Sequence, residues 1–164
     1  MRHDKIMEAP RIGLGYDCHR LEVGGDCYIG GVLFDSELAP VGHSDADVLL
    51  HAICDAILGA AGLDDLGTVF KDNDEQWRNC SSSVFIEYCM KQITEKHLCL
   101  ASLDCVVICD NPKISPMRGA IRQRLCELTG LQVDRINVKG KTTEGGDVMV
   151  ITAQAVTLLV DSEL

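Results

Sequence analysis

The chain has 164 residues, which is the size of one ordinary domain and enough to bury a substantial core. Its 15 Lys and Arg against 25 Asp and Glu give a net charge of −10, which argues against nonspecific binding to nucleic acid or to an anionic membrane. An anionic substrate therefore needs local positive partners, such as a few lysines, a helix N-terminus or bound cations.

The first ten residues, MRHDKIMEAP, mix charges and lack the apolar stretch of a signal peptide. No segment has about 18 consecutive apolar residues, so we expect no membrane span and a cytoplasmic protein. The nine cysteines contain no C-x-x-C pair, and many lie in apolar runs, which indicates reduced thiols used as small core residues. We expect residues 1–10 to be an N-terminal extension and residues 11–164 to form one domain.

Two strands are predicted near the N-terminus. Weak alternation over residues 10–16 predicts the first, and the apolar run CYIGGVLF over residues 27–34 predicts the second. The glycine pair at 24–25 suits a hairpin-like arrangement of the two. The glycine pair at 30–31 is consistent with a bulge in the second strand.

A long helix is predicted next, from HSDADVLLHAICDAILGAAGL at residues 43–63. Ser44 suits its N-cap, and Asp45 and Asp47 suit its first turn. The polar segment over residues 64–83 is rich in turn formers and predicts a long loop, which in a compact domain is usually functional or mobile.

Helices and strands continue to interleave in the second half of the chain. We expect a helix from the serines at 81–83 to about Lys96, a buried strand over 98–110, a helix over 117–128, and strands over 135–141 and 147–160. The predicted class is α/β (α+β), a single domain with helices on one face of a mixed four-stranded sheet.

The stretch GYDCHRL places Asp17 and His19 at positions i and i+2 of an extended segment, so both project from one face and can hold one ion. His51 is the best third ligand, because it lies on a polar stripe with Asp47 and Asp55 along an apolar helix. Either aspartate could hold the second ring nitrogen of His51. A solvated helix face and a polar strand end explain the same residues, so spacing alone leaves both interpretations open.

The start of the predicted helix offers a phosphate site. Backbone N–H groups and the positive end of the helix dipole suit an anion there, and the side chains of His43 and Ser44 could add hydrogen bonds. Capping alone explains Ser44 equally well, so this cluster is a second open hypothesis.

A third cluster joins turn lysines with hydroxyl and carboxylate groups that follow a strand: Lys113, Lys139, Lys141, Thr142, Thr143 and Glu144. A pair of hydroxyls can orient a diphosphate, and a carboxylate can take Mg²⁺ together with substrate phosphates. Solvated lysines at turns are the alternative, just as the loop residues Asp64, Asp65, Asp72 and Asp74 are ordinary turn formers.

Taken in order, GYDCHRL, IGGV, GHSDADVLLHAICDAILGAAGLDDLGTVFKDND, NPKI and VKGKTTE closely resemble the 2-C-methyl-D-erythritol 2,4-cyclodiphosphate synthase family of the non-mevalonate isoprenoid pathway. The match spans about residues 11–160. The resemblance implies a lyase that converts 4-diphosphocytidyl-2-C-methyl-D-erythritol 2-phosphate into the cyclic diphosphate and CMP. It also implies a homotrimer with its sheets around a central axis and active sites between neighbouring subunits.

The resemblance further implies two bound metal ions. Asp17, His19 and His51 would hold Zn²⁺ or another divalent cation, and Glu144 would hold Mg²⁺ or Mn²⁺ together with the substrate diphosphate. These four residues, with Thr142 and Thr143, are the expected catalytic set.

The residues expected to bind substrate are, in chain order, His43, Ser44, Asp65, Gly67, Asp72, Asp74, Lys113, Thr142 and Thr143. By the same resemblance, His43 and Ser44 would hold the 2-phosphate and Asp65 would bind a hydroxyl of the erythritol. Lys113 falls where the family binds cytidine diphosphate, from the adjoining subunit, and the two threonines match its diphosphate contacts.

Three features depart from the family pattern. Lys71 in FKDND replaces a proline, and Lys141 in KTTE replaces a threonine. The turn after Glu144 is shorter than usual and lacks a lysine, a phenylalanine and an arginine that line the trimer's central cavity in relatives. The resemblance therefore does not extend to binding of an isoprenoid diphosphate in that cavity.

Two other functions remain open at this point. One is a metal-dependent phosphodiesterase that uses water as the nucleophile and acts on a nucleotide-diphosphate-linked polyol. The other is a non-catalytic zinc- or nucleotide-binding module, which would need a fourth protein ligand because structural zinc sites are closed. Cys18 is the one nearby thiol, and its position in the strand points it away from Asp17 and His19.

Overall fold

The computed structural model describes residues 9–71, 75–77 and 80–162. The strands are β1 (Arg11–Val23), β2 (Cys27–Ile29), β3 (Val32–Phe34), β4 (Leu38–Pro40), β5 (Leu98–Ile108), β6 (Ile136–Lys141) and β7 (Val150–Asp161). The helices are α1 (Val48–Ala60), α2 (Leu66–Val69), α3 (Ser83–Glu95) and α4 (Arg118–Thr129). Short 3₁₀ turns, η1 (Glu75–Trp77), η2 (Ser115–Met117) and η3 (Val133–Arg135), connect them.

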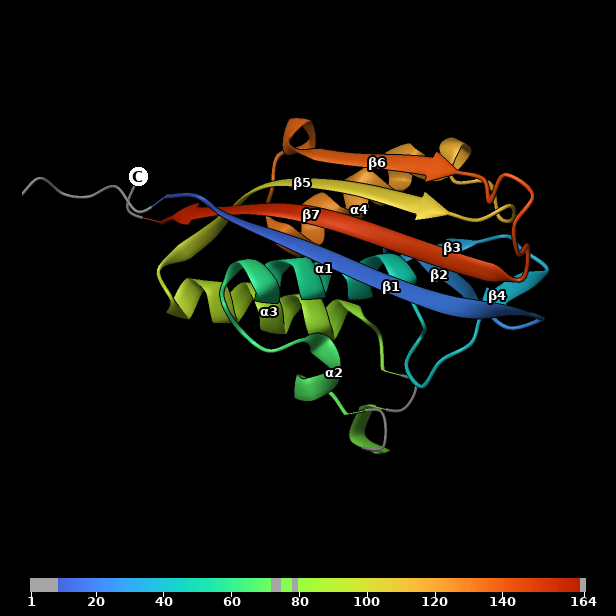
Figure 1. Ribbon diagram of the computed structural model, residues 1–164, viewed down its shortest axis with the longest axis horizontal. Helices are drawn as coiled ribbons and strands as arrows, with labels where there is room; N and C mark the ends of the chain where they lie inside the picture. The colour runs from blue at the N-terminus through green and yellow to red at the C-terminus, as the bar shows by residue number, and fades with distance from the viewer. Residues whose placement is uncertain (1–8, 72–74, 78–79, 163–164) are drawn as a thin grey trace, which may run out of the picture.

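The main sheet has five strands in the order β4-β1-β7-β5-β6. Strand β5 runs parallel to β6, and the other neighbours are antiparallel, so the predicted mixed sheet is confirmed. The predicted strand count of four is wrong, because the edge strand β4 pairs with the end of β1 from Leu21 to Val23. The helices cover one face of this sheet (Figure 1), as expected.

The prediction for residues 27–34 is also wrong. These residues form two short antiparallel strands, β2 and β3, in a separate two-stranded sheet. Gly30 and Gly31 both have positive φ, 64° and 73°, which makes them the turn of a hairpin and not a bulge within one strand. Strand β1 pairs instead with β7, more than a hundred residues away along the chain.

Helix α1 begins four residues later than Ser44, so Ser44 is not its N-cap. Asp47 caps the helix, because its carboxylate accepts hydrogen bonds from the backbone N–H groups of Leu49 and Leu50. The same carboxylate accepts from the N–H groups of Gly30 and Gly31, which fastens the β2–β3 turn to the helix start. Asp47 is completely buried.

The later elements agree with expectation. Helix α3 starts at the predicted serines, and α4 ends at Gly130, whose φ of 75° is the left-handed geometry typical of a helix C-terminus. Within the predicted loop over residues 64–83, the structure adds the one-turn helix α2 and the turn η1. Residues 1–8 lie outside the described part of the chain, so the N-terminal extension stays a prediction.

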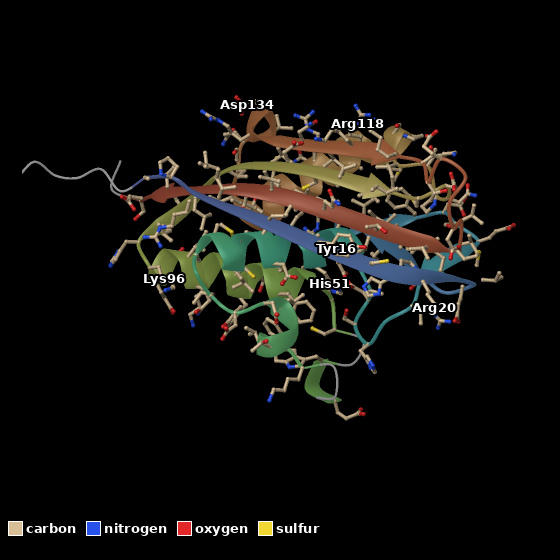
Figure 2. The ribbon with its side chains drawn as sticks, viewed as in Figure 1. Tyr16, Arg20, His51, Lys96, Arg118 and Asp134 are labelled. Atoms are coloured by element: carbon tan, nitrogen blue, oxygen red, sulfur yellow. The ribbon has the colours of Figure 1, made fainter. Side chains whose placement is uncertain are left out.

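Helix α1 packs directly on β1 because glycines and alanines meet at the contact. A Cβ atom added to Gly13 would lie 1.8 Å from the carbonyl oxygen of Ala56, and one added to Gly15 would lie 1.8 Å from that of Ala52. No side chain fits at either position. The backbone of β1 therefore touches the backbone of α1, and the two elements lie side by side in Figure 2. This contact fixes how residues of the two elements face each other.

The opposite face of the sheet carries uncovered apolar side chains. Ile12, Leu14 and Tyr16 of β1 are 72%, 69% and 56% exposed, and Val156 of the neighbouring β7 is 43% exposed. Apolar side chains concentrated on one sheet face are typical of a surface that another chain covers. Among the described residues, no helix combines the length and the apolar character that crossing a membrane requires.

Candidate metal centre and active-site pocket

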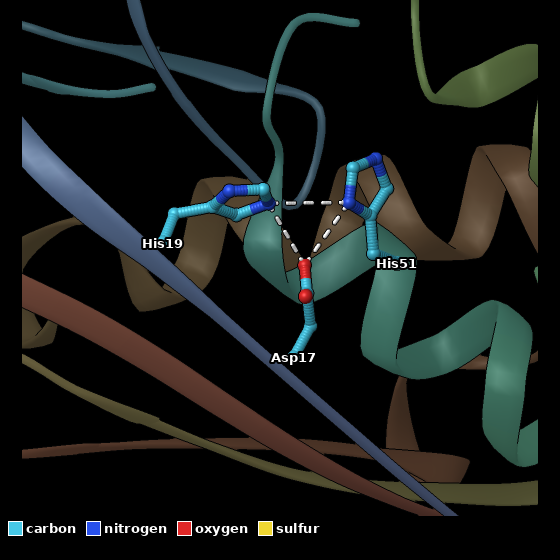
Figure 3. A group of neighbouring side chains, drawn as sticks. All are labelled: Asp17, His19 and His51. Atoms are coloured by element: carbon cyan, nitrogen blue, oxygen red, sulfur yellow. Dashed lines mark hydrogen bonds and ion pairs between the residues drawn. The ribbon is translucent and has the colours of Figure 1, made fainter. Parts of the chain in front are cut away.

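The contact between β1 and α1 brings three predicted ligands together. Asp17 and His19 follow Gly15 on the same face of β1, and His51 immediately precedes Ala52 on α1. The Asp17 Oδ2 atom lies 3.0 Å from His19 Nε2 and 3.0 Å from His51 Nδ1 (Figure 3). The two imidazole nitrogens lie 3.4 Å apart.

Each imidazole is held through its other ring nitrogen. His19 Nδ1 lies 3.0 Å from the carbonyl oxygen of Val41, to which it donates, so Nε2 is left to face the cluster. His51 Nε2 lies 2.8 Å from the hydroxyl of Ser82, which leaves Nδ1 to face the cluster. Two nitrogen lone pairs and a carboxylate oxygen then converge within 4.8 Å of one another. This donor set fits one divalent cation with room for a further ligand.

The electrostatics of the cluster favour a negative Asp17 beside a positive His19. Burial by itself would raise the pKa of Asp17, but hydrogen bonds and positive charge from His19 and His51 outweigh it, and the pKa lies below its usual range. Burial would lower the pKa of His19, but the hydrogen bond and charge of Asp17, with the Val41 carbonyl, raise it above the usual 6.5.

The predicted supporting role of Asp47 or Asp55 is wrong. Asp47 is buried in its cap, and Asp55 accepts a hydrogen bond of 2.8 Å from the N–H of Leu66 at the start of α2. Burial is the largest influence on the pKa of either carboxyl group, and it raises both. Asp47 and Asp55 therefore connect α1 to neighbouring elements. The second ring nitrogen of His51 is held instead by Ser82, at the start of α3.

A pocket of about 390 Å³ opens beside the three ligands. Among the expected substrate-binding residues, His43, Ser44 and Gly67 line it together with the three ligands. Lys71, which departs from the family pattern, also lines it and adds a positive charge. Phe70, Trp77 and Phe85 also line the pocket, and Phe70 packs against Trp77, Phe85 and Tyr88 with ring centroids 4.8, 4.5 and 5.0 Å away. This aromatic wall gives the pocket an apolar side.

Asp65 does not line this pocket in the isolated chain. It is the N-cap of α2, and its carboxylate accepts a hydrogen bond of 2.8 Å from the N–H of Thr68. Hydrogen bonds from Thr68 hold the pKa of Asp65 below its usual range. Asp72 and Asp74 lie outside the described residues.

Residues expected to bind the nucleotide line a second pocket, of about 330 Å³, on another part of the chain. Lys113, Lys141 and Thr142 line it, between η2 and the end of β6. Thr143 donates a hydrogen bond to Asp110, and Thr142 donates one to Glu144, whose φ is positive at 52°. Within one chain, Lys113, Lys141 and Thr142 therefore line a different pocket from the three predicted metal ligands.

Sequence reasoning missed Ser82 and Asp45. The serine run at 81–83 indicated only a helix start, and no spacing rule connects a serine to a histidine 31 residues earlier. Asp45 was assigned to the first turn of α1, but it lies before the helix and accepts hydrogen bonds from the backbone N–H and the hydroxyl of Ser82.

The geometry defines a single-domain α/β protein in which a strand and a helix bring together three side chains that could hold a divalent cation. Comparison with known proteins then identifies the family: the chain belongs to the YgbB family, whose sequence pattern matches residues 10–160. The predicted family is thereby confirmed.

Named relatives are similar over most of their length. The 2-C-methyl-D-erythritol 2,4-cyclodiphosphate synthase of Aquifex aeolicus is 44% identical over 135 residues, covering 82% of this chain and 86% of the relative. That of Solibacter usitatus is 46% identical over 138 residues, covering 84% and 87%.

Solved structures agree with the fold. A CDP-bound 2C-methyl-D-erythritol-2,4-cyclodiphosphate synthase superimposes with a TM-score of 0.87 at 40% identity, covering 91% of this chain and 99% of that one. The CDP complex of IspF from Plasmodium falciparum gives a TM-score of 0.82 at 33% identity, covering 93% and 97%.

Proposed function

We propose that this chain is a lyase of the non-mevalonate isoprenoid pathway that converts 4-diphosphocytidyl-2-C-methyl-D-erythritol 2-phosphate into 2-C-methyl-D-erythritol 2,4-cyclodiphosphate and CMP. The observation that carries the proposal is the convergence of Asp17, His19 and His51 at a pocket, in a chain whose relatives bear the name of this synthase.

The reaction needs positioning and charge neutralisation and no protein nucleophile. An oxygen of the 2-phosphate attacks the β-phosphorus, the bond from that phosphorus to the bridging oxygen breaks, and CMP leaves with the bridging oxygen. The chain must bring two polyanionic ends of one substrate into line although its own net charge is −10. Bound cations supply the missing positive charge.

We assign Zn²⁺ to Asp17, His19 and His51, and Mg²⁺ or Mn²⁺ to Glu144 with the substrate diphosphate. The nitrogen-rich set suits zinc, whereas the lone carboxylate suits a cation that takes most of its ligands from phosphate and water. When bound, the zinc ion acts as a Lewis acid and a template for a phosphate oxygen. The residues around it orient the substrate and exclude water.

His43 and Ser44 are suited to hold the 2-phosphate. The hydroxyl oxygen of Ser44 accepts a hydrogen bond from the N–H of Ala46 at 3.3 Å and lies 3.2 Å from His51 Nε2. The single Nε2 proton goes to the nearer Ser82 hydroxyl, so only the N–H of Ala46 uses a lone pair of Ser44. The O–H of Ser44 is then left to donate to a phosphate oxygen, beside the bound cation.

The sugar and nucleotide contacts are assigned from the family resemblance, and the pockets support Gly67, Lys113 and Thr142 among them. Gly67 lets the erythritol approach the backbone. Asp65, at the N-cap of α2, accepts a hydrogen bond from a sugar hydroxyl. The roles of Asp72 and Asp74 stay predictions. Lys113, Thr142 and Thr143 bind the cytidine diphosphate. Lys141 adds a second cation to that pocket.

We further propose a homotrimer whose active sites lie between subunits. Two features support it: the metal pocket and the nucleotide pocket are separate within one chain, and the uncovered face of β1 and β7 is apolar. Burial of that face around a central axis would remove Ile12, Leu14 and Tyr16 from water. The same packing would bring the nucleotide pocket of one subunit to the metal pocket of the next.

Phosphorus-31 NMR of the purified protein with substrate, Zn²⁺ and Mg²⁺ tests the reaction. The proposal predicts CMP release together with the coupled phosphorus pair of a cyclic diphosphate, and a chelator should stop both. CMP with linear phosphates only would favour a phosphodiesterase, and no reaction by a zinc-loaded protein would favour a binding module. No relative described above carries either alternative name.

A further inference from the structure

The hydroxyl of Ser82, at the N-cap of α3, lies on the side of the His51 ring that faces away from the metal centre. We propose that Ser82 and Asp45 form a relay that fixes the tautomer and orientation of His51, so that Nδ1 presents a lone pair to the metal. This proposal rests on the metal site proposed above. It makes Ser82 and Asp45 positioning residues, which touch neither metal nor substrate.

The requirement comes from the chemistry of imidazole. A neutral ring carries one N–H, and its other nitrogen is an acceptor or a ligand. His51 Nδ1 lies 3.0 Å from Asp17 Oδ2 on the metal side, so the proton must be on Nε2 for His51 to ligate. Nε2 lies 2.8 Å from the Ser82 hydroxyl oxygen, which must therefore accept.

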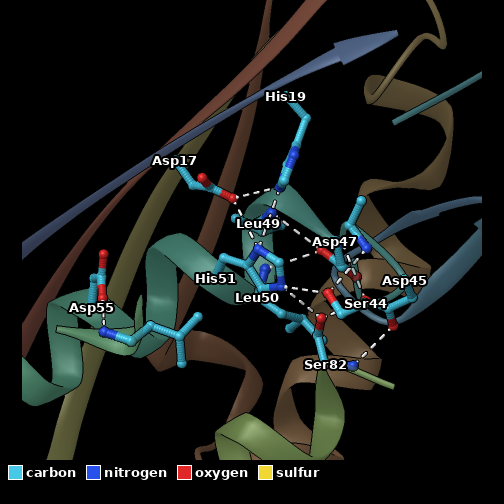
Figure 4. Close-up of polar contacts among 12 residues, drawn as sticks. Asp17, His19, Ser44, Asp45, Asp47, Leu49, Leu50, His51, Asp55 and Ser82 are labelled. Atoms are coloured by element: carbon cyan, nitrogen blue, oxygen red, sulfur yellow. Dashed lines mark hydrogen bonds and ion pairs between the residues drawn. The ribbon is translucent and has the colours of Figure 1, made fainter. Parts of the chain in front are cut away.

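Asp45 decides that the hydroxyl accepts. Ser82 donates its own hydroxyl proton to Asp45 Oδ1, and its backbone N–H donates to Asp45 Oδ2 at 2.9 Å (Figure 4). Because the carboxylate takes the hydroxyl proton, the lone pairs of Ser82 are turned toward His51. Ser82 is fully buried, so bulk water does not compete for these bonds.

Asp45 is itself anchored to both helices. Its backbone N–H donates to the carbonyl of Cys80 at 3.2 Å, just before α3, and its Oδ1 accepts from the N–H of Asp47 at the cap of α1. The relay thus ties the start of α3 to the start of α1. A carboxylate, a hydroxyl and an imidazole in series extend the carboxylate–histidine arrangement common around protein metal sites.

The other candidate supports for His51 are used elsewhere. Asp47 accepts from four backbone N–H groups, and Asp55 accepts from the N–H of Leu66 at the start of α2. Ser44 Oγ is farther from Nε2, at 3.2 Å, and belongs to the phosphate site. His19 is supported by the backbone carbonyl of Val41, which no substitution removes, so His51 is the ligand whose support can be tested by mutation.

The test compares zinc affinity and imidazole tautomer in three purified metal-free proteins: wild type, Ser82→Ala and Ser81→Ala. Ser81 is the matched control, because its exposed hydroxyl contacts Ser83 Oγ at 2.9 Å and not His51. Competition with a chromogenic chelator gives the dissociation constant. Loss of such outer partners typically weakens metal binding about 10- to 100-fold, and we expect at least about tenfold for Ser82→Ala and no change for Ser81→Ala.

Long-range ¹⁵N–¹H NMR at alkaline pH reads the tautomer directly. The proposal predicts a smaller fraction of the Nε2–H tautomer of His51 in Ser82→Ala than in the wild type and in Ser81→Ala, because loss of the Ser82 acceptor leaves Asp17 Oδ2 as the competing acceptor at Nδ1. Should Ser82→Ala fail to fold, Asp45→Asn keeps the side-chain size and should also lower this fraction and weaken zinc binding.

The two proposals fail in different ways. Wild-type zinc affinity and an unchanged tautomer in Ser82→Ala, with zinc still lost in His51→Ala, would overturn the relay and leave the metal site standing. A wild-type protein that binds no zinc would overturn the metal site, and the relay with it.

Discussion

Replacing Gly15 by alanine tests the contact that assembles the metal centre. The added Cβ would lie 1.8 Å from the carbonyl oxygen of Ala52, whereas real Cβ contacts are essentially never shorter than 3.0 Å. Helix α1 must therefore retreat from β1 by about 1.2 Å or distort. His51 moves with α1, but Asp17 and His19 stay on β1, and a metal site tolerates displacements of only about 0.2 Å.

The expected cost has two parts. Overpacking of this kind destabilises a protein by about 1–3 kcal/mol, which for a chain of this size lowers Tm by roughly 2–12 °C. Zinc affinity should fall at least about tenfold. Differential scanning calorimetry and chelator competition measure the two effects.

Gly59→Ala is the matched control on the same helix, because a Cβ there meets nothing within 4 Å. It should stabilise the protein by about 0.5–1 kcal/mol through the better helix propensity of alanine. Wild-type Tm and zinc affinity in Gly15→Ala would refute the reasoning that this glycine sets the ligand geometry.

Three further predictions concern the metals and pH. His51→Ala should lose its bound zinc, measured by elemental analysis, and its turnover, measured by CMP release. The control Cys18→Ala, on the opposite face of the strand beside Thr152, should keep both. A His51→Ala protein that is active without zinc would contradict the ligand assignment. Glu144→Gln should raise the Mg²⁺ concentration needed for half-maximal rate and leave the bound zinc unchanged. If this variant also lost zinc, the two metal sites would not be separate. Because the pKa of His19 is raised on folding, its protonation stabilises the metal-free protein fully below the usual 6.5, and that stability is lost as pH rises through the folded-state value. Urea unfolding of chelator-treated protein should show this decline, and His19→Gln should lack it; equal pH profiles would sink the idea.

Local sequence patterns predicted most helices and the interleaved class because those features depend on near neighbours. The serines at 81–83 and Gly130 correctly bounded α3 and α4. The start of α1 was misplaced because Ser44 and Asp47 are both good caps in isolation, and the choice depends on the N–H groups of Gly30 and Gly31 that Asp47 also accepts.

Long-range pairing was beyond local patterns. The alternation of residues 10–16 indicated a strand, but nothing local specified β7 as its partner or continued it to Val23. Edge strand β4 has only three residues, too few to show a period.

The candidate site also contains residues that local patterns indicate and residues that only long-range packing brings in. Spacing made Asp17, His19 and His51 candidates for a metal site but left a solvated-face interpretation open, and only the resemblance to a known family singled them out as ligands. Ser82 reaches His51 only through the packing of α3 against α1, which no spacing in the sequence encodes.

The most direct test of the account is a crystal structure of the zinc-loaded protein, with anomalous diffraction measured on both sides of the zinc absorption edge. We predict one anomalous peak per chain bonded to a carboxylate oxygen of Asp17, His19 Nε2 and His51 Nδ1, with the remaining position open to solvent or phosphate. Zinc bound elsewhere, or closed off by a fourth protein ligand, would contradict a catalytic metal at this centre.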